Sequence, residues 1–220
     1  MTLPLLRLLP AAPALRPAGR ALLLACAVLA GCAGTRPAAT LLTLPPAELR
    51  PAEAPAAAAP GPVVSVRRVA IPEYLLTRKV RFRANSSTLA EWPQTYWAER
   101  IEVGVTREFV SALRQALPGW TVCEASCNDR VAELALQVDL APLDLQRSAG
   151  MLQSHARVSV SSTAAAAPGA PRVQQLVDRR FEQPSGADTP QGHAQALTDV
   201  LEAVAQATAD GLRQRVTPVR

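Results

Sequence analysis

The sequence predicts an α+β domain in which two helices pack on one face of a mainly antiparallel sheet. Three observations lead to this fold class. Several short runs alternate apolar and polar residues, which indicates half-buried strands, and two longer runs place apolar residues at spacings of three and four, which indicates amphipathic helices. Along the chain these runs follow the order strand, strand, helix, strands, helix, and this order is typical of helices that lie on one side of a sheet.

A strand is expected over residues 63–71, where β-branched residues dominate and Pro72 ends the run. A second strand is expected over 79–83, because apolar residues occupy every second position. A helix follows over 101–117, since its apolar residues recur at spacings of three and four before a Pro-Gly pair. The single apolar stripe of this helix predicts one packed side, against the sheet.

The second half of the chain predicts three more strands, over 134–140, 152–160 and 173–181. Pro142 interrupts the alternating pattern after the first of them, and apolar residues resume out of phase. A proline cannot donate to a strand ladder, so we expect a β-bulge or a sheet edge there. A loop rich in Ala, with a Pro-Gly pair, separates the last two strands.

A last helix is expected to begin after a cap at Asp188 or Thr189, with Pro190 in its first turn. Its apolar stripe runs from Leu197 to Leu212. The folded domain is therefore expected to be 63–217. With 220 residues and only eight aromatic side chains, the chain can fill one modest core.

The first 31 residues are typical of an export signal. Arginines precede the apolar run 21–29, which is too short for a transmembrane helix. The run ends in a pattern that resembles a bacterial lipobox: Leu29, Ala30, Gly31 and Cys32. The Cys32 thiol would then carry a diacylglycerol and fix the protein to a membrane. The alternative is an ordinary cleaved signal in which Cys32 is incidental.

Residue 33 is Ala rather than the Asp that retains enterobacterial lipoproteins at the inner membrane, so the periplasmic face of the outer membrane is expected. Inner-membrane retention is the less favoured alternative. Residues 32–62 form a predicted Pro/Ala-rich tether that could reach roughly 90 Å if fully extended. Within it, Leu41–Leu44 is apolar enough to dock as an edge strand, and the sequence leaves this open.

The net charge is +5, but three of these charges come from arginines in the predicted signal, which contains no acid. The charge of a chain that begins at Cys32 would be only +2, so nucleic-acid binding is not expected. No glycine-rich phosphate loop and no nucleophile motif around Ser154 and His155 is present, and His193 lies in a helix's first turn. We therefore expect no catalytic residue, no enzyme activity, no cofactor and no metal.

Cys123 and Cys127 are four positions apart in a chain predicted to enter an oxidising compartment. A local disulfide is the first interpretation. Zinc binding would need two more ligands, which His155 and His193 do not supply at a suitable spacing. A catalytic redox pair usually has two residues between its cysteines, and free thiols are the remaining alternative.

Cations cluster around the second predicted strand, and aromatic residues cluster just before the first helix. The cations are either a solvated sheet face or a surface for anionic headgroups or an acidic partner. The aromatic residues either pack in the core or anchor a partner or acyl chain. The candidate contact residues are Arg78, Lys79, Arg81, Arg83, Trp92, Tyr96 and Trp97.

A strand that ends in Pro72-Glu73-Tyr74-Leu75, followed by Trp97-Ala98-Glu99 at the start of a helix, resembles the PqiC-like family of ABC-type transport auxiliary lipoproteins. The resemblance covers 63–117 and is supported by the lipobox. The family's aromatic pair is missing near Leu41–Leu44. The Cys123/Cys127 pair is not a feature carried over from the family.

The resemblance implies a non-catalytic accessory of an MCE-type (Mla-like) intermembrane transporter. Its partners would be an MCE-domain subunit (PqiB- or MlaD-like) and the separate permease and ATPase chains. The cargo would be phospholipid or another hydrophobic molecule. A stand-alone periplasmic carrier of lipid or of a small hydrophobic ligand is the alternative.

Overall fold

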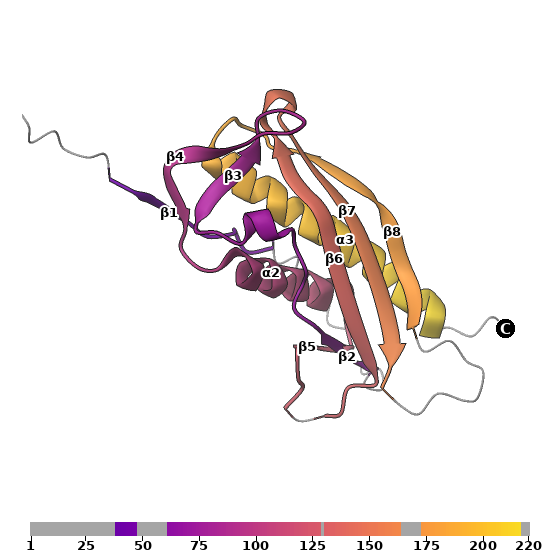
Figure 1. Ribbon diagram of the computed structural model, residues 1–220. Helices are drawn as coiled ribbons and strands as arrows, with labels where there is room; N and C mark the ends of the chain where they lie inside the picture. The colour runs from indigo at the N-terminus through magenta and orange to yellow at the C-terminus, as the bar shows by residue number, and fades with distance from the viewer. Residues whose placement is uncertain (1–37, 48–60, 129, 164–172, 217–220) are drawn as a thin grey trace, which may run out of the picture. The chain divides into compact units, whose positions relative to one another are not determined.

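The computed structural model describes residues 38–47, 61–128, 130–163 and 173–216 (Figure 1). The predicted signal, Cys32 and the rest of the predicted tether lie outside these residues. The compact unit is Ala39–Arg220. Its elements are β1 (Thr40–Leu42), β2 (Val63–Val66), η2 (Glu73–Leu75), β3 (Lys79–Arg83), β4 (Leu89–Trp97), α2 (Ile101–Ala116), β5 (Thr121–Glu124), β6 (Leu134–Gln146), η3 (Arg147–Ala149), β7 (Met151–Ser162), β8 (Val173–Pro184) and α3 (Pro190–Val216).

The eight strands form one mixed sheet, so the expectation of a mainly antiparallel sheet is wrong. Strands β6, β7 and β8 are antiparallel, as are β3 and β4, but four other pairs are parallel: β1–β4, β2–β5, β2–β6 and β3–β6. Parallel neighbours need a crossover connection. Helix α2 lies within such a crossover, between β2 and β5, and returns the chain in the same direction.

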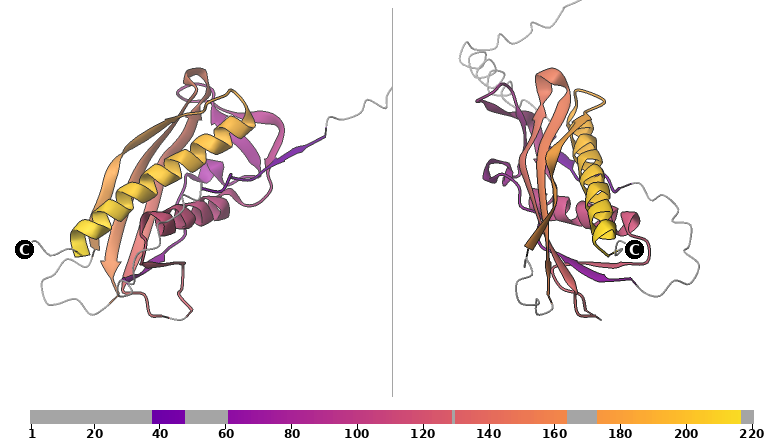
Figure 2. Two further views of the ribbon diagram at one scale, coloured as in Figure 1. Left: turned by 180° about the vertical axis from the view of Figure 1, so that it is seen from behind. Right: turned by 90° about the vertical axis from the view of Figure 1, so that its right-hand side faces the viewer.

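Both helices cover the same face of the sheet, which confirms the α+β class (Figure 2). Leu136, Val138 and Leu140 of β6 point toward the helices and are fully buried, whereas Gln137 between them is exposed. Phe109 and Leu113 of α2 are equally buried, because the apolar stripe faces the sheet and α3. Neither of the two α-helices in the described residues covers the opposite face of the sheet, called the open face below (Figure 2).

The segment around β1 docks on the folded unit. Leu42 lies beside Trp97 of β4 in parallel register, and the side chains of Leu42 and Leu44 are buried. The Ala47 N–H donates to a Glu108 carboxylate oxygen at 3.3 Å, and the Thr198 hydroxyl donates to the Pro45 carbonyl at 3.0 Å. The folded unit thus extends N-terminally of Val63, because these apolar side chains complete the core.

Strands β4 and β5 were not expected from the sequence, since Pro93 interrupts β4 and β5 is only four residues long. The bulge expected at Pro142 is confirmed by a register shift between Leu140 and Leu143. The start of α3 is capped by Thr189, whose hydroxyl accepts a hydrogen bond from the Gly192 N–H at 3.0 Å.

Candidate functional site

The residues of the Pro72-Glu73-Tyr74-Leu75 motif form η2, a turn held by a buried carboxylate. The Tyr74 hydroxyl donates to Asp144 at 3.0 Å, and the Arg83 guanidinium donates to the other oxygen of Asp144 at 2.8 Å. Asp144 is only 4% exposed and lies just after the bulge of β6. Burial, followed by the charge of Asp144, raises the pKa of Tyr74. The motif therefore joins η2, β3 and β6 through one ionic centre.

Most of the cations predicted around β3 are paired with acids. Both Lys79, at 2.5 Å, and Arg81, at 3.2 Å, contact Glu91 of the neighbouring strand. The hydrogen bond from Lys79 lowers the pKa of the Glu91 carboxyl. Arg83 is held by Asp144, and the Arg78 side chain is exposed. The paired cations thus stabilise the sheet, and only part of the predicted basic surface is available to a partner.

The predicted contact role of Trp92 and Trp97 is corrected, because both side chains are buried. Trp92 packs on Phe82 at 5.1 Å between ring centroids, and the Arg147 guanidinium covers it 4.1 Å from the ring centroid. Trp97 lies edge-on to His193 of α3. Both are core residues, Trp92 beside β3 and η3 and Trp97 beside α3, whereas Tyr96 is half-buried on the other side of β4.

The Trp97-Ala98-Glu99 motif connects β4 to α2. The Ala98 N–H donates to the Leu42 carbonyl at 2.7 Å, so the motif also fixes the end of β1. The Glu99 carboxylate accepts two hydrogen bonds from Arg107 of α2, each 2.7 Å long. The motif therefore sets the position of α2 against the sheet rather than forming a reactive centre.

A groove crosses the open face, near the end of β6 that adjoins β2. Two adjoining hollows of about 400 and 130 Å³ form it, and they share Gln137, Ser159 and Val173. Arg67 lines the smaller hollow and Arg157 the larger. We call this the open-face groove; its lining residues are Arg67, Ala135, Leu136, Gln137, Asp139, Arg157, Val158, Ser159, Ser161, Val173 and Gln175.

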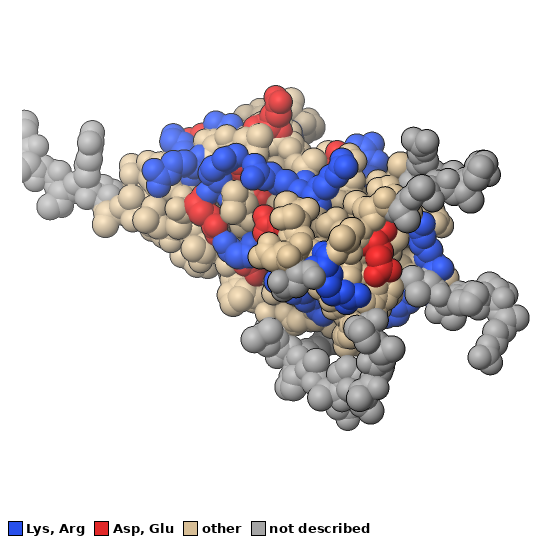
Figure 3. Space-filling model, turned by 90° about the horizontal axis from the view of Figure 1, so that it is seen from below, with Lys and Arg blue, Asp and Glu red and all other residues tan. Residues whose placement is uncertain are grey.

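The open-face groove is lined by both polar and apolar groups, and its Arg157 is paired with Asp139 at 3.2 Å, so its remaining positive charge comes from Arg67. No motif in the sequence predicts it. Its residues come from the consecutive strands β6, β7 and β8 and from Arg67, which lies in the loop after β2, far from these strands along the chain. Arg67 and Arg68 beside it are exposed. In a view from below, Lys and Arg side chains gather in a band across the molecule (Figure 3). A surface of this kind is suited to an acidic or polar partner.

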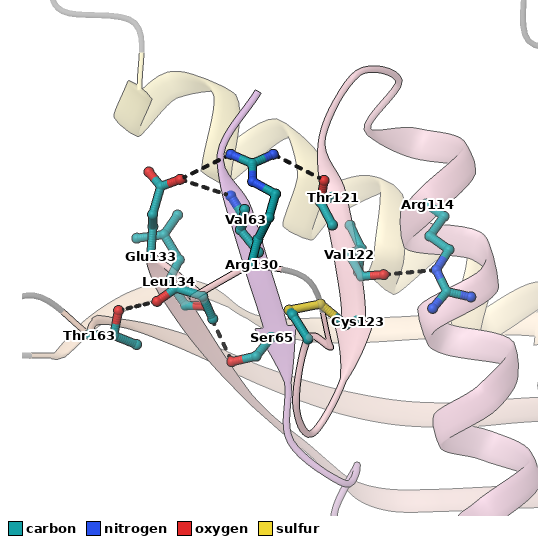
Figure 4. Close-up of a disulfide and its surroundings, with 12 residues drawn as sticks. Val63, Ser65, Arg114, Thr121, Val122, Cys123, Arg130, Glu133, Leu134 and Thr163 are labelled. Atoms are coloured by element: carbon teal, nitrogen blue, oxygen red, sulfur yellow. Dashed lines mark hydrogen bonds and ion pairs between the residues drawn. A yellow bond between two sulfur atoms is a disulfide. The ribbon is translucent and has the colours of Figure 1, made fainter. Parts of the chain in front are cut away.

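The predicted disulfide between Cys123 and Cys127 is confirmed, with the two Cα atoms 5.4 Å apart (Figure 4). It closes the start of the loop from β5 to β6. Arg114 of α2 donates to the Val122 carbonyl at 2.9 Å, and the Ser65 hydroxyl donates to Leu134 at 3.4 Å. The bridge therefore braces an edge of the sheet that is already tied to α2 and β6.

Replacing both cysteines with serine is expected to lower the free energy of unfolding by about 1–2 kcal/mol, because the bridge closes a very short loop. Urea denaturation of the oxidised protein and of the double variant measures this difference. Reduction of the unaltered protein should produce a similar loss. A decrease in the free energy of unfolding of more than about 4 kcal/mol would mean that the disulfide stabilises much more of the domain than the loop that it closes.

The histidines do not form a catalytic arrangement with Ser154. The His155 Nε2 lies 2.5 Å from Asp178 on the open face, whereas the Ser154 side chain points to the buried side. His193 is buried. Among the described residues, no group of three His, Cys, Asp or Glu side chains is placed to hold a metal ion. No helix in this part of the chain is long and apolar enough to cross a membrane.

Large side chains fill the space between the helices and the sheet. Each of the following is less than 2% exposed: Phe109, Leu113, Leu136, Leu140, Leu152, Leu201 and Leu212. Packing of this density leaves apolar groups in mutual contact. The described interior is therefore a core, and the open-face groove is the stronger candidate for a functional surface.

The chain is similar to proteins of one family in sequence and fold. The model of the ABC-type transport auxiliary lipoprotein component family matches residues 43–209. The crystal structure of an uncharacterized protein has a TM-score of 0.60 at 16% identity, covering 81% of this chain and 99% of that one. A Xanthomonas campestris protein of the DUF330 family has a TM-score of 0.57 at 12% identity, covering 80% and 98%. Comparison with curated proteins finds no match.

Proposed function

The chain belongs to the family of ABC-type transport auxiliary lipoprotein components, the PqiC-like family, and from this we propose that it docks an MCE-type transporter at the outer membrane. Acylated Cys32 would hold it on the periplasmic face. The permease, the ATPase and the MCE subunit would be separate chains, and the cargo would be phospholipid or another hydrophobic molecule. The observation that carries this proposal is the family match over 43–209.

A docking role without catalysis is supported by the ion pairs in which the acidic side chains of the domain are engaged. The carboxylates of Asp144, Glu91 and Glu99 are all engaged by cations that hold the fold. The filled interior between helices and sheet favours docking over the alternative of a lipid carrier, because a carrier needs space for its cargo. Transport would then depend on contacts between subunits.

We place the contact with the MCE subunit at the open-face groove. Arg67 gives it positive charge, Arg157 is paired with Asp139, and its hollows can receive side chains of a partner. The groove lies where β6 adjoins β2, whereas β1 and β4 lie at the other end of the sheet (Figure 1). A partner could therefore reach the groove without meeting the end of the domain at which the anchored segment enters.

A photo-reactive amino acid at Gln137 is expected to crosslink the protein to an MCE subunit in native membranes. The matched control is Gln206, an exposed glutamine on α3, on the other side of the molecule. Mass spectrometry of the adducts should find the MCE subunit at least fivefold enriched for Gln137. Equal adducts from both positions would contradict the assignment of the groove.

Cys32→Ser is expected to release the protein from membranes, because the acyl chains would provide the attachment. Fractionation followed by immunoblotting should move more than nine-tenths of the protein into the soluble periplasmic fraction. Cys123→Ser is the control, since this thiol lies in the disulfide and its loss should leave the protein membrane-bound. A Cys32→Ser protein that still sediments fully with membranes would contradict the lipid anchor.

A further inference from the structure

The docked β1 strand greatly shortens the link between the proposed anchor and the folded unit. Only seven residues, 33–39, separate Cys32 from Thr40, where β1 begins. At about 3.1 Å per residue, the eight steps from Cys32 to Thr40 span roughly 25 Å when extended. Residues 48–60 then connect two parts of the same folded unit and add nothing to its reach. The end of the sheet that carries β1 must therefore stay close to the anchored membrane.

Three side chains form a row across this end of the sheet, on the open face. Leu41 of β1 lies opposite Tyr96 of β4, which in turn lies opposite Lys79 of β3. The flanking residues Leu42 and Trp97 point to the core, so the row points away from the helices. We call Leu41, Tyr96 and Lys79 the interfacial row.

The interfacial row has the chemistry of a phospholipid interface. Leu41 is 60% exposed, and Leu76 in the turn before β3 is 50% exposed, so two leucines present apolar surface near this end of the sheet. Tyr96 is half-buried, and tyrosine is enriched at the level of lipid headgroups. Lys79 and Arg78 are exposed cations that suit anionic headgroups, and Lys79 is also paired with Glu91.

We propose that the interfacial row rests against the phospholipid headgroups of the membrane that carries the Cys32 anchor. This inference rests on the anchor of the proposed function and adds an orientation to it. The short link selects the membrane as the occupant, because it ties the proposed anchor to within about 25 Å of this edge. The open-face groove, near the β2 end of β6, then lies toward the end of the sheet that is farther from the membrane surface.

Headgroup quenching tests this orientation in the acylated full-length protein. Leu41→Cys and Val131→Cys each introduce a thiol at an exposed apolar position, and Val131 is 88% exposed just before β6. The native thiols are occupied, since Cys123 and Cys127 form a disulfide and Cys32 would be acylated. A fluorophore is attached to each variant, and the proteins are reconstituted in phosphatidylethanolamine/phosphatidylglycerol vesicles that contain a lipid with a nitroxide on its headgroup.

Quenching at position 41 is expected to be at least threefold greater than at position 131. A third label, at Gln137→Cys in the open-face groove, should behave like position 131. Equal quenching at positions 41 and 131 in protein that floats with the vesicles would overturn the orientation and leave the anchor intact. Protein that fails to float would overturn both the anchor and the inference that rests on it.

Discussion

Replacing Asp144 with alanine is expected to lower the free energy of unfolding by about 3 kcal/mol. The substitution removes the carboxylate that accepts hydrogen bonds from Tyr74 and Arg83, and it leaves the Arg83 charge without its partner beneath the turn. Breaking a buried pair by removing one member is strongly destabilising. Chemical denaturation followed by circular dichroism measures the loss. The pKa of Tyr74 should also fall, because the charge of Asp144 contributes to raising it.

Asp188→Ala is the matched control for this prediction. Asp188 also pairs with an arginine, Arg147, at 2.7 Å, but its side chain is 63% exposed. Exposed ion pairs contribute about 0–1 kcal/mol, so this variant should lose less than 1 kcal/mol. If Asp144→Ala and Asp188→Ala lower the free energy of unfolding by the same amount, the carboxylate shared by Tyr74 and Arg83 does not hold the turn formed by the motif.

The stability of the protein is expected to fall by about 3 kcal/mol as the pH drops from 6.5 to 4, because of His193. Burial lowers the pKa of His193 to about 4, from the ordinary value of 6.5. Between these values the unfolded chain binds a proton that the folded protein does not, so stability decreases as the pH falls. Well above pH 6.5 the side chain is neutral in both states and the effect disappears.

His193→Phe should flatten this part of the pH profile, since the ring would still pack against Trp97 but could not take up a proton. Urea denaturation at a series of pH values from 4 to 7 gives the profile. His155→Asn is the control, because His155 is exposed beside Asp178 and its loss should leave the decline in place. A His193→Phe profile as steep as that of the unaltered protein would show that another group carries the dependence.

Periodic patterns of apolar residues allowed most helices and strands to be predicted. The direction of the strands in the sheet was not predicted, because it depends on pairing between segments far apart in the sequence. The helical stripe through Phe109 and Leu113 and the alternation through Leu136 and Val138 indicated α2 and β6, because each pattern reflects a face buried against the core. Strand β4 was missed because Pro93 breaks its pattern. The mixed sheet could not be predicted, since strand direction depends on which distant segments pair.

The candidate site was much less predictable than the fold. The cations Lys79 and Arg83 were visible in the sequence, but Arg83 is neutralised by Asp144, sixty-one positions away. Burial of Trp97 follows from the docking of β1 and α3, which local sequence does not specify. The open-face groove arises only when β6 pairs with β2 and β7, and β7 with β8, so no local motif marks it.

Affinity purification of the acylated protein from native membranes, after brief chemical crosslinking, tests the proposed docking role most directly. The expected result is an MCE-domain subunit, together with its permease and ATPase, at levels at least fivefold above those obtained with the Cys32→Ser protein. Recovery of the acylated protein from the membrane fraction without any MCE subunit would contradict the role proposed for it.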